Sequence, residues 1–284
     1  MVKIISTAKD LFEERLKETS RVSFVPTMGN LHAGHISLLE EALKNSEVVY
    51  FSIFVNPKQF GPHEDFHKYP RTLAYDMALI EDCSKKHADK KVVVFAPTDP
   101  QEIYPDGQGQ IISVTGLKDV IEGQSRPGHF DGVATVVYRL FDLVKPKQAY
   151  FGLKDYQQYL VIRQMVKDLN LPIDIIGMPI IRDPSGLALS SRNQYLSVED
   201  KKEALALPHA LKKIADLIQG KRANLPKAGR EIATLLLDSK WNYLEMRDAE
   251  TLSEDLTKSN QLILLGVYQI GSTRLLDNLQ LEIR

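Results

Sequence analysis

The sequence has one cysteine, Cys83, so neither a disulfide nor a metal site built from several cysteines can form within one chain. It also lacks a long apolar segment, since none approaches the roughly 20 residues of a membrane-spanning helix. Its N-terminal segment predicts an acidic amphipathic helix instead of the apolar core of a signal peptide. We therefore expect a soluble, cytoplasmic protein with no membrane partner.

The chain has no excess of charge of either sign. Its 36 Lys and Arg residues nearly balance its 37 Asp and Glu residues, so no global basic field can hold a nucleic-acid backbone, although this balance does not exclude a local basic cleft. Hydrophobic residues make up 43% of the chain, too many for a disordered protein. We expect a globular protein that captures a small molecule locally and has no nucleic-acid partner.

The first part of the chain alternates β-rich segments with amphipathic helical segments. The expected strands are 21–27, 47–57, 91–97, 148–152 and 173–180, and the expected helices are 35–46, 72–88, 131–145 and 156–170. This alternation predicts an α/β fold with a Rossmann-like, doubly wound parallel sheet of about five strands. We assign residues 1–180 to this N-terminal nucleotide-binding domain.

The composition changes after Ile181. A turn at 183–186 leads into Lys-, Glu-, Ala- and Leu-rich helical segments, and three final segments alternate apolar and polar residues. Such alternation predicts a small antiparallel meander with one face in solvent. We assign residues 181–284 to a smaller C-terminal α+β domain of helices and antiparallel strands.

The segment PTMGNLHAGH, residues 26–35, lies between a β-rich segment and an amphipathic helix. Three-residue spacing puts His32 and His35 on one side of the first helical turn, where backbone N–H groups and the positive end of the helix dipole favour phosphate. Gly29 and Gly34 allow main chain or ligand to approach closely, because they have no Cβ. The motif predicts a nucleotide site.

Two other interpretations of the paired histidines stay open. In the first, His32 and His35 form a polar helix N-terminus without a ligand. In the second they bind zinc, which requires another ligand from distant parts of the chain, with His63, His67 and His129 as candidates.

Two loop segments before and after the third expected strand carry further polar groups. Asn56 and Gln59 follow the second expected strand, and the carboxyl ends of neighbouring strands share one ligand crevice in such sheets, so Gln59 can hydrogen-bond a small polar substrate. Arg126 and His129 lie in a Gly/Pro-rich stretch that suits a mobile anion-binding loop. An ordinary solvated loop fits each of these residues as well.

FGLKDYQQYLVI, residues 151–162, follows the fourth expected strand. Lys154 at the entrance of the helix can meet an anionic ligand, and Asp155 and Gln158 add hydrogen-bonding groups. Taken alone, Asp155 also fits an ordinary acid at a helix N-terminus.

RDPSGLALSSRNQYLS, residues 182–197, combines a turn with two hydroxyls and a guanidinium. Ser190 and Ser191 can donate hydrogen bonds to a polyphosphate, and Arg192 can pair bidentately with phosphate oxygens. The alternative is a helix cap followed by a surface arginine.

In this order, the segments resemble the pantothenate synthetase family, also called pantoate-beta-alanine ligases, of the nucleotidyltransferase superfamily. PTMGNLHAGH resembles the family's HIGH motif, and LSSRN takes the place of the KMSKS-like loop. The resemblance spans essentially the whole chain. It implies an AMP-forming ligase of coenzyme A biosynthesis that makes an amide (carbon-nitrogen) bond. In the implied first step, pantoate and ATP, with Mg²⁺, form pantoyl adenylate and pyrophosphate. In the second step, beta-alanine reacts with the adenylate to give pantothenate and AMP. The resemblance also implies a homodimer formed through the N-terminal domain.

The resemblance assigns catalytic and nucleotide-binding roles. His35 is the expected proton donor with His32 beside it, and Lys154 and Arg192 are expected phosphate clamps. Leu189 replaces the family's usual Met, with little expected consequence because the two side chains are similar in volume and apolarity. The expected ATP-binding residues are Met28, Gly29, Asn30, Leu31, His32, Ala33, Gly34, His35, Gly152, Leu153, Lys154, Asp155, Ile181, Leu189, Ser190, Ser191 and Arg192.

The resemblance assigns the other substrates to neutral side chains. Gln59 and Gln158 are expected to bind pantoate, and Gln59 also beta-alanine. Asn56 and Arg126 match positions near the substrates or phosphates.

Two other functions share part of this pattern. A cytidylyltransferase or adenylyltransferase acting on a phosphate substrate has the histidine motif, but a phosphate substrate calls for several basic residues where this chain has Gln59 and Gln158. A non-catalytic nucleotide-binding module has the site without the adenylation chemistry. Pantoate-dependent exchange of pyrophosphate into ATP separates an adenylating enzyme from such a module.

Overall fold

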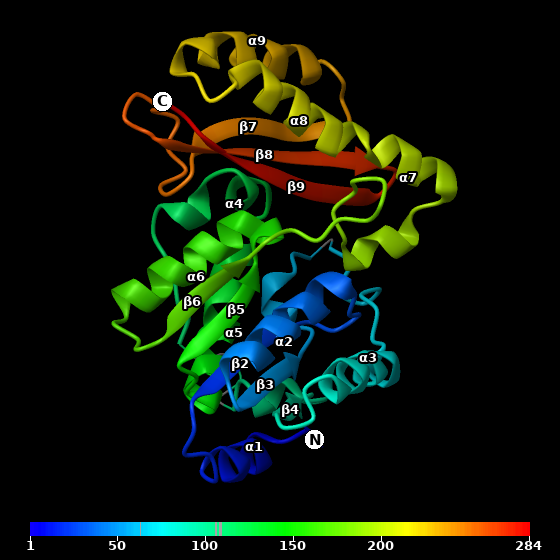
Figure 1. Ribbon diagram of the computed structural model, residues 1–284, viewed down its shortest axis with the longest axis vertical. Helices are drawn as coiled ribbons and strands as arrows, with labels where there is room; N and C mark the ends of the chain where they lie inside the picture. The colour runs from blue at the N-terminus through cyan, green and yellow to red at the C-terminus, as the bar shows by residue number, and fades with distance from the viewer. Residues whose placement is uncertain (63, 106, 108–109) are drawn as a thin grey trace. The chain divides into compact units, whose positions relative to one another are not determined.

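The computed structural model describes residues 1–62, 64–105, 107 and 110–284. The chain forms two compact units: Met1–Leu153 with Gln157–Pro179, and Lys154–Tyr156 with Ile180–Arg284. In Figure 1 the first unit runs from blue to green, and residues 180–284 of the second unit run from yellow-green to red.

The first unit is built on a sheet of six parallel strands in the order β1-β4-β3-β2-β5-β6. The strands are β1 (Val2–Ile5), β2 (Val22–Thr27), β3 (Val48–Ile53), β4 (Lys91–Phe95), β5 (Gln148–Gly152) and β6 (Asp174–Met178). The chain runs outward from β2 through β3 to β4 and then crosses to β5 on the other side of β2. Such sheets bind ligands beyond the carboxyl ends of the strands that flank this reversal. The predicted doubly wound parallel sheet is confirmed.

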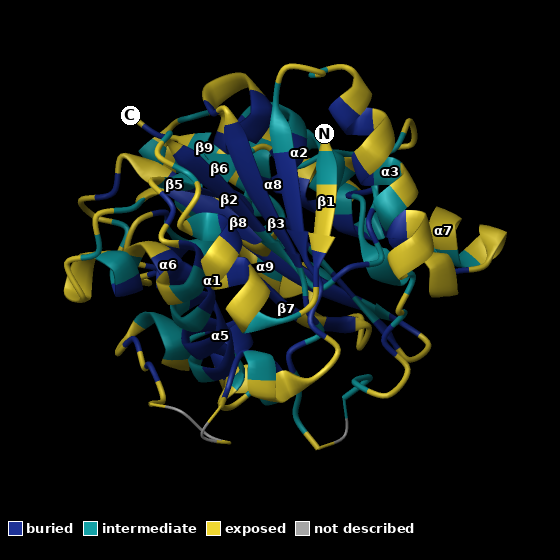
Figure 2. Ribbon diagram, turned by 90° about the horizontal axis from the view of Figure 1, so that it is seen from below, coloured by how far each residue is buried: buried dark blue, intermediate teal, exposed yellow. Residues whose placement is uncertain are grey.

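Helices cover both faces of this sheet (Figure 1). Successive side chains of a strand point to opposite faces, so Phe24 packs in the core with α1, α5 and α6, while Val25 packs in the core with α2 and α3. Figure 2 shows the central strands in the dark blue of buried residues. The helices are α1 (Ala8–Arg15), α2 (Ala33–Asn45), α3 (Leu73–Lys85), α5 (His129–Val144) and α6 (Tyr156–Asp168), with the shorter elements η1 (Pro57–Gln59), η2 (Pro100–Glu102), η3 (Leu117–Asp119), α4 (Glu122–Ser125) and η4 (Leu153–Asp155).

The prediction for the N-terminal segment is partly wrong. Val2–Ile5 forms the edge strand β1, which pairs with β4, and the helix begins only at Ala8. Thr7 caps that helix, because its side chain accepts a hydrogen bond from the backbone N–H of Asp10 at 3.1 Å. The sheet therefore has six strands, one more than the sequence indicated.

The second unit contains a three-stranded antiparallel sheet in the order β7-β8-β9. Helices α8 and α9 lie over one face of it (Figure 1) and share its apolar core. Gly266 in β8 makes this close packing possible, since a Cβ there would lie 2.9 Å from Leu207 Cδ1. The predicted meander is confirmed. The elements are η5 (Ser191–Tyr195), α7 (Val198–Ala204), α8 (Ala206–Ile218), η6 (Arg222–Asn224), α9 (Leu225–Leu235), β7 (Trp241–Asp248), β8 (Gln261–Ile270) and β9 (Thr273–Glu282).

Within the part of the chain that the structure describes, no helix combines the length and the apolar character that crossing a membrane requires.

Candidate active site

The paired histidines lie where β2 leads into α2. His32 is the N-cap of α2, and its Nδ1 accepts a hydrogen bond from the backbone N–H of Gly34 at 3.1 Å. The Nδ1 of His35 in turn accepts from the backbone N–H of His32 at 3.3 Å. The ring centroids are 4.1 Å apart. The two rings therefore lie together at the first turn, as their spacing predicts.

These contacts define the tautomer of both rings. Because the Nδ1 of His32 and the Nδ1 of His35 each accept a hydrogen bond, a neutral ring carries its proton on Nε2. Each neutral imidazole then has an Nε2–H group that can donate a hydrogen bond. A doubly protonated ring would have to give up its bond to the backbone.

Gly34 leaves room for the ring of His32. A Cβ on Gly34 would lie 2.8 Å from the Cε1 and 2.9 Å from the Nδ1 of His32, too close for any real contact. The sequence predicts that another group approaches Gly34 closely. That group is the ring of His32, which belongs to the same motif.

Asp76, which the sequence analysis missed, holds the loop before α2. Its carboxylate oxygens accept hydrogen bonds from the backbone N–H groups of Asn30 at 3.0 Å and Leu31 at 2.8 Å. The sequence does carry a signal for it, because Asp76 lies on the same helical stripe as the buried Ile80 and Cys83. An acid on an apolar helix face needs a specific partner.

Gln59 links the loops that follow β2 and β3. It ends the turn η1, and its Nε2 lies 2.9 Å from the sulfur of Met28 in the histidine loop. Asn56 caps η1, and its Nδ2 donates to the Oε1 of Gln59 at 3.3 Å and to the backbone oxygen of Gly132 at 3.1 Å. The Oδ1 of Asn56 accepts from the hydroxyl of Tyr104 at 2.9 Å. The amide nitrogen and the amide oxygen of Asn56 are thus both hydrogen-bonded within the protein, and Asn56 orients Gln59.

Arg126 and His129 bind the main chain of Gln59. The Nδ1 of His129 donates to the backbone oxygen of Gln59 at 2.8 Å, and the Nη2 of Arg126 donates to the same oxygen at 3.3 Å. The Nη1 of Arg126 lies 3.1 Å from the Nε2 of His129. Burial, together with the charge of Arg126, lowers the pKa of His129 to about 4, so this ring is neutral at physiological pH.

Glu64, also missed from the sequence, pairs with Arg126. Its two carboxylate oxygens accept from Nε and Nη2 of Arg126. The Nη1 of Arg126 contacts His129, and its Nη2 also contacts the backbone oxygen of Gln59. Every nitrogen of the guanidinium therefore has a partner within the protein. A contact between Arg126 and a substrate or phosphate stays a prediction, while its bonds to Gln59 are observed.

The segment after β5 carries Lys154. Gly152 ends β5, η4 follows, and the Nζ of Lys154 lies 3.7 Å from the Oδ1 of Asp155 directly before α6. The backbone oxygen of Lys154 accepts from the Nδ2 of Asn278 at 2.8 Å, a contact within the second unit. Lys154 does lie at the entrance of a helix, as the sequence predicts.

The neighbouring glutamines of α6 differ. Gln157 is buried, and its amide bonds the backbone of Glu122, Leu117 and Val120. Gln158 is only partly buried. Pantoate binding by Gln158 stays a prediction.

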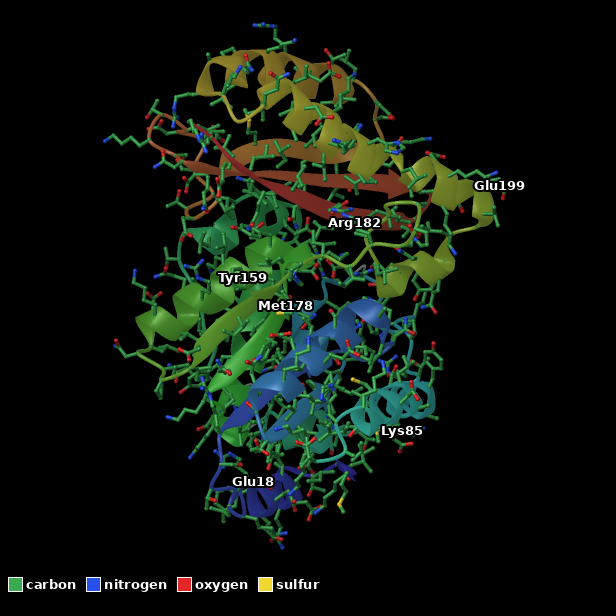
Figure 3. All side chains as sticks on the ribbon, in the orientation of Figure 1. Glu18, Lys85, Tyr159, Met178, Arg182 and Glu199 are labelled. Carbon is green, nitrogen blue, oxygen red and sulfur yellow. The ribbon has the colours of Figure 1, made fainter. Side chains whose placement is uncertain are left out.

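The segment from Ile181 to Arg192 folds back on itself. The backbone N–H of Leu189 donates to the oxygen of Ile181 at 2.9 Å, and the Oγ of Ser190 accepts from the N–H of Arg192 at 3.3 Å. Ser190 thus caps η5, in agreement with the helix-cap interpretation. Arg182, labelled in Figure 3, anchors the segment to β9 through Asp277, at 2.6 and 2.9 Å.

The expected site residues divide between the two units. The first unit holds Met28, Gly29, Asn30, Leu31, His32, Ala33, Gly34, His35, Asn56, Gln59, Arg126, Gly152, Leu153 and Gln158. The second holds Lys154, Asp155, Ile181, Leu189, Ser190, Ser191 and Arg192. Within the first unit, Met28, Gln59, Asn56 and Arg126 form one connected set of contacts.

Among the described residues, no group of three or more His, Cys, Asp or Glu side chains could hold a metal ion. Of the candidate zinc ligands, His63 lies outside the described residues. Both ring nitrogens of His129 are engaged by Gln59 and Arg126.

Comparison with known proteins identifies the family. A model of the pantoate-beta-alanine ligase family matches residues 1–280. The chain is 46% identical to a pantothenate synthetase of Trichlorobacter lovleyi, with 92% of this chain and 91% of that protein covered.

Solved structures agree with this assignment. The fold is similar to that of pantothenate synthetase from Thermus thermophilus, with a TM-score of 0.87, 41% identity and coverage of 98% of this chain and 99% of the other. A pantoate-beta-alanine ligase from Francisella tularensis, complexed with beta-gamma ATP and beta-alanine, gives a TM-score of 0.76 at 34% identity, with 98% and 97% covered. This chain therefore belongs to the pantoate-beta-alanine ligase family.

Proposed function

We propose that this chain forms pantothenate in two steps, through a pantoyl adenylate made at the paired histidines. Membership of the family gives the overall reaction, which joins pantoate to beta-alanine with ATP. In the first step a carboxylate oxygen of pantoate bonds to the α-phosphorus of ATP, and the bond to the pyrophosphate oxygen breaks. In the second, the amine of beta-alanine attacks the acyl carbon, loses a proton, and AMP leaves.

The observation that carries this proposal is the pair of Nε2–H donors that His32 and His35 provide at the N-terminus of α2. An anionic carboxylate must approach an anionic phosphate, so catalysis depends on positioning and on stabilising the charge of the phosphate oxygens. The Nε2–H groups of the two imidazoles and the helix N-terminus supply such stabilisation. His35 is the proposed proton donor, and no covalent enzyme nucleophile is needed.

We assign pantoate and beta-alanine to amide side chains. Gln59 is the proposed ligand of both substrates, because four neighbouring groups hold its backbone and side chain at the loop beside Met28. Gln158 is proposed as the second pantoate ligand, since its neighbour Gln157 is already bound to main-chain groups. An amide side chain is neutral and both donates and accepts hydrogen bonds. It can therefore bind a hydroxy acid without neutralising the carboxylate that acts as the nucleophile.

Lys154 and Arg192 are the proposed phosphate clamps. The remaining proposed ATP contacts are those expected from the sequence, in residues 28–35, Gly152, Leu153, Asp155, Ile181, Leu189, Ser190 and Ser191. Mg²⁺ is proposed to enter bound to the phosphates of ATP, as this ion commonly does. Bound there, it would offset phosphate charge beside Lys154.

We further propose that residues 1–180 act as the nucleotide-binding domain and 181–284 as the smaller domain of a cytoplasmic homodimer. Phe12 and Leu16, one helical turn apart on and just after α1, expose 54% and 67% of their surface, and such an apolar surface suits a contact between copies. Light scattering on the purified protein measures the oligomeric state, and a monomer would contradict the dimer.

The adenylate is tested by exchange of labelled pyrophosphate into ATP without beta-alanine. Two-step chemistry predicts exchange that depends on pantoate. If the enzyme forms pantothenate from all three substrates but shows no exchange, the adenylate mechanism is wrong.

A further inference from the structure

The loop between β2 and α2 has two consecutive residues with positive φ angles, Gly29 at 80° and Asn30 at 51°. Glycine and asparagine adopt such angles more readily than other residues, and contacts from surrounding groups hold the loop in this conformation. The loop leads directly into the N-cap His32. Whatever enforces the loop conformation therefore also places the paired histidines.

Asp76 of α3 is the side chain that holds this loop. Its Oδ2 accepts a hydrogen bond from the N–H of Asn30 at 3.0 Å, and its Oδ1 accepts from the N–H of Leu31 at 2.8 Å. The hydroxyl of Thr72, one turn earlier on the chain, donates to Oδ1 at 3.1 Å. One carboxylate thus satisfies two consecutive N–H groups of a loop that is 45 and 46 residues away in sequence.

Gly29 is shaped to the same carboxylate. A Cβ on Gly29 would lie 3.0 Å from the Oδ2 of Asp76 and 2.9 Å from the Cγ2 of Ile53. The glycine therefore serves the loop twice, because it permits the positive φ angle and leaves space for the carboxylate.

The surroundings of Asp76 indicate a positioning role. Its side chain is fully buried, with 0% of the residue exposed. Among the residues that the structure describes, it has no ion-pair partner, and its hydrogen bonds come from the two loop N–H groups and Thr72. A carboxylate buried without a cation is costly, and an apolar residue would serve the core of α3 better. Its position is explained by what it does for the loop.

We propose that Asp76 is a positioning residue of the ATP site, which acts by fixing the backbone of residues 29–31 and thereby the entry to α2. It does not need to touch the substrate. This inference rests on the proposed role of residues 28–35 in ATP binding.

The test compares Asp76→Asn with the matched variant Asp82→Asn, which makes the same chemical change on the exposed side of α3. An amide has one acceptor oxygen, so its NH₂ group would face one of the two loop N–H groups. Two readouts are measured for each variant: the affinities for ATP and for pantoate by calorimetric titration, and the hydrogen exchange of individual backbone amides by NMR.

We expect Asp76→Asn to weaken the affinity for ATP on the order of tenfold or more, because the variant loses a charge-assisted hydrogen bond. The affinity for pantoate should stay within about twofold of the wild-type value. Exchange of the Asn30 and Leu31 amides should accelerate relative to the Leu38 and Leu39 amides of α2. Asp82→Asn should leave all of these unchanged.

Equal losses of ATP and pantoate affinity, or unchanged ATP affinity, would overturn the proposal. If Asp76→Asn does not fold, exchange in the wild-type protein decides: protected Asn30 and Leu31 amides support the inference, and exchange as fast as in exposed loops refutes it. Neither readout requires catalysis. Absence of pyrophosphate exchange would therefore count against the adenylate mechanism and not against this role of Asp76.

Discussion

The guanidinium of Arg126 and the carboxylate of Glu64 form two parallel hydrogen bonds, Nε to Oε1 at 2.7 Å and Nη2 to Oε2 at 2.5 Å. This pair joins the loop after η1 to the end of α4, and Arg126 also holds the backbone oxygen of Gln59. Burial raises the pKa of Glu64, but the hydrogen bonds and charge of Arg126 outweigh it and hold the pKa below its ordinary value. The pair is therefore ionised at neutral pH.

Glu64→Gln should impair pantoate use specifically. The variant removes the charge that fixes Arg126, so the carbonyl of Gln59 loses its alignment. We expect KM for pantoate to rise on the order of tenfold, while KM for ATP changes by less than about twofold. Steady-state kinetics with Glu81→Gln, an exposed glutamate of α3, provides the control. A parallel rise in both KM values would argue that Glu64 supports the fold as a whole.

His35→Ala should slow adenylate formation. Loss of the Nε2–H donor removes charge stabilisation at the phosphate, so pyrophosphate exchange should fall by a factor on the order of 10² to 10⁴. The control variant His209→Ala, at an exposed position of α8, should catalyse pyrophosphate exchange at the wild-type rate. Exchange near the wild-type rate in His35→Ala would refute the proposed role of this histidine.

Gly34→Ala should damage the site without weakening the helix. The new Cβ would force the ring of His32 to move from its place at 2.8 Å, and misplacement of about 1 Å costs on the order of 10²-fold in rate. Gly229→Ala is the matched control, since it lies within α9 with no atom within 4 Å of its Cβ. Gly229→Ala should leave pyrophosphate exchange unchanged and raise the free energy of unfolding by about 0.5–1 kcal/mol. A fully active Gly34→Ala enzyme would show that the ring position of His32 is unimportant.

Glu14 should make the stability depend on acid pH. Hydrogen bonds from Lys3 and Lys91 lower the pKa of Glu14 from 4.5 to about 2, against the opposing effect of burial. A lowered folded-state pKa favours the folded protein above pH 4.5, and this contribution is lost as the pH falls toward about 2. We expect Glu14→Gln to lower the free energy of unfolding by about 2 kcal/mol at neutral pH, after allowing for the solvent exposure of the lysines.

Urea titrations of wild type and Glu14→Gln across this pH range measure the difference. It should shrink as the pH falls toward about 2, where about half of the folded wild-type molecules carry a protonated Glu14. Glu13→Gln, on the exposed side of α1, should match wild type throughout. A difference between wild type and Glu14→Gln that stays constant with pH would show that packing, and not charge, makes Glu14 stabilising.

Local patterns explain why the sequence predicts that His32 and His35 lie together at a helix N-terminus. Their spacing and the following amphipathic segment define a helix N-terminus within a few residues, so no distant group is needed to bring the rings together. Strand β1 shows the opposite case. Val2–Ile5 is too short to be distinguished from the adjoining helix by periodicity, and it becomes a strand by pairing with β4, some ninety residues away.

Asp76 and Glu64 were missed for a related physical reason. Each is an acidic residue in a segment rich in charge, and its function depends on a partner that lies 45 or more residues away in the chain. Burial provides the decisive information in both cases. Asp76 is fully buried, so its charge requires particular hydrogen bonds, whereas the exposed Asp82 of the same helix does not.

The alternation of strands and helices, the motif at residues 26–35 and the resemblance to a family can all be recognised in the sequence, because each depends on neighbouring residues or on their order along the chain. The contacts that support those residues become visible only in the folded chain. The carboxylate of Asp76 beneath the loop, and Arg126 and His129 on the carbonyl of Gln59, are contacts between segments far apart in sequence. Such contacts arise only once the sheet has brought the carboxyl ends of its strands together.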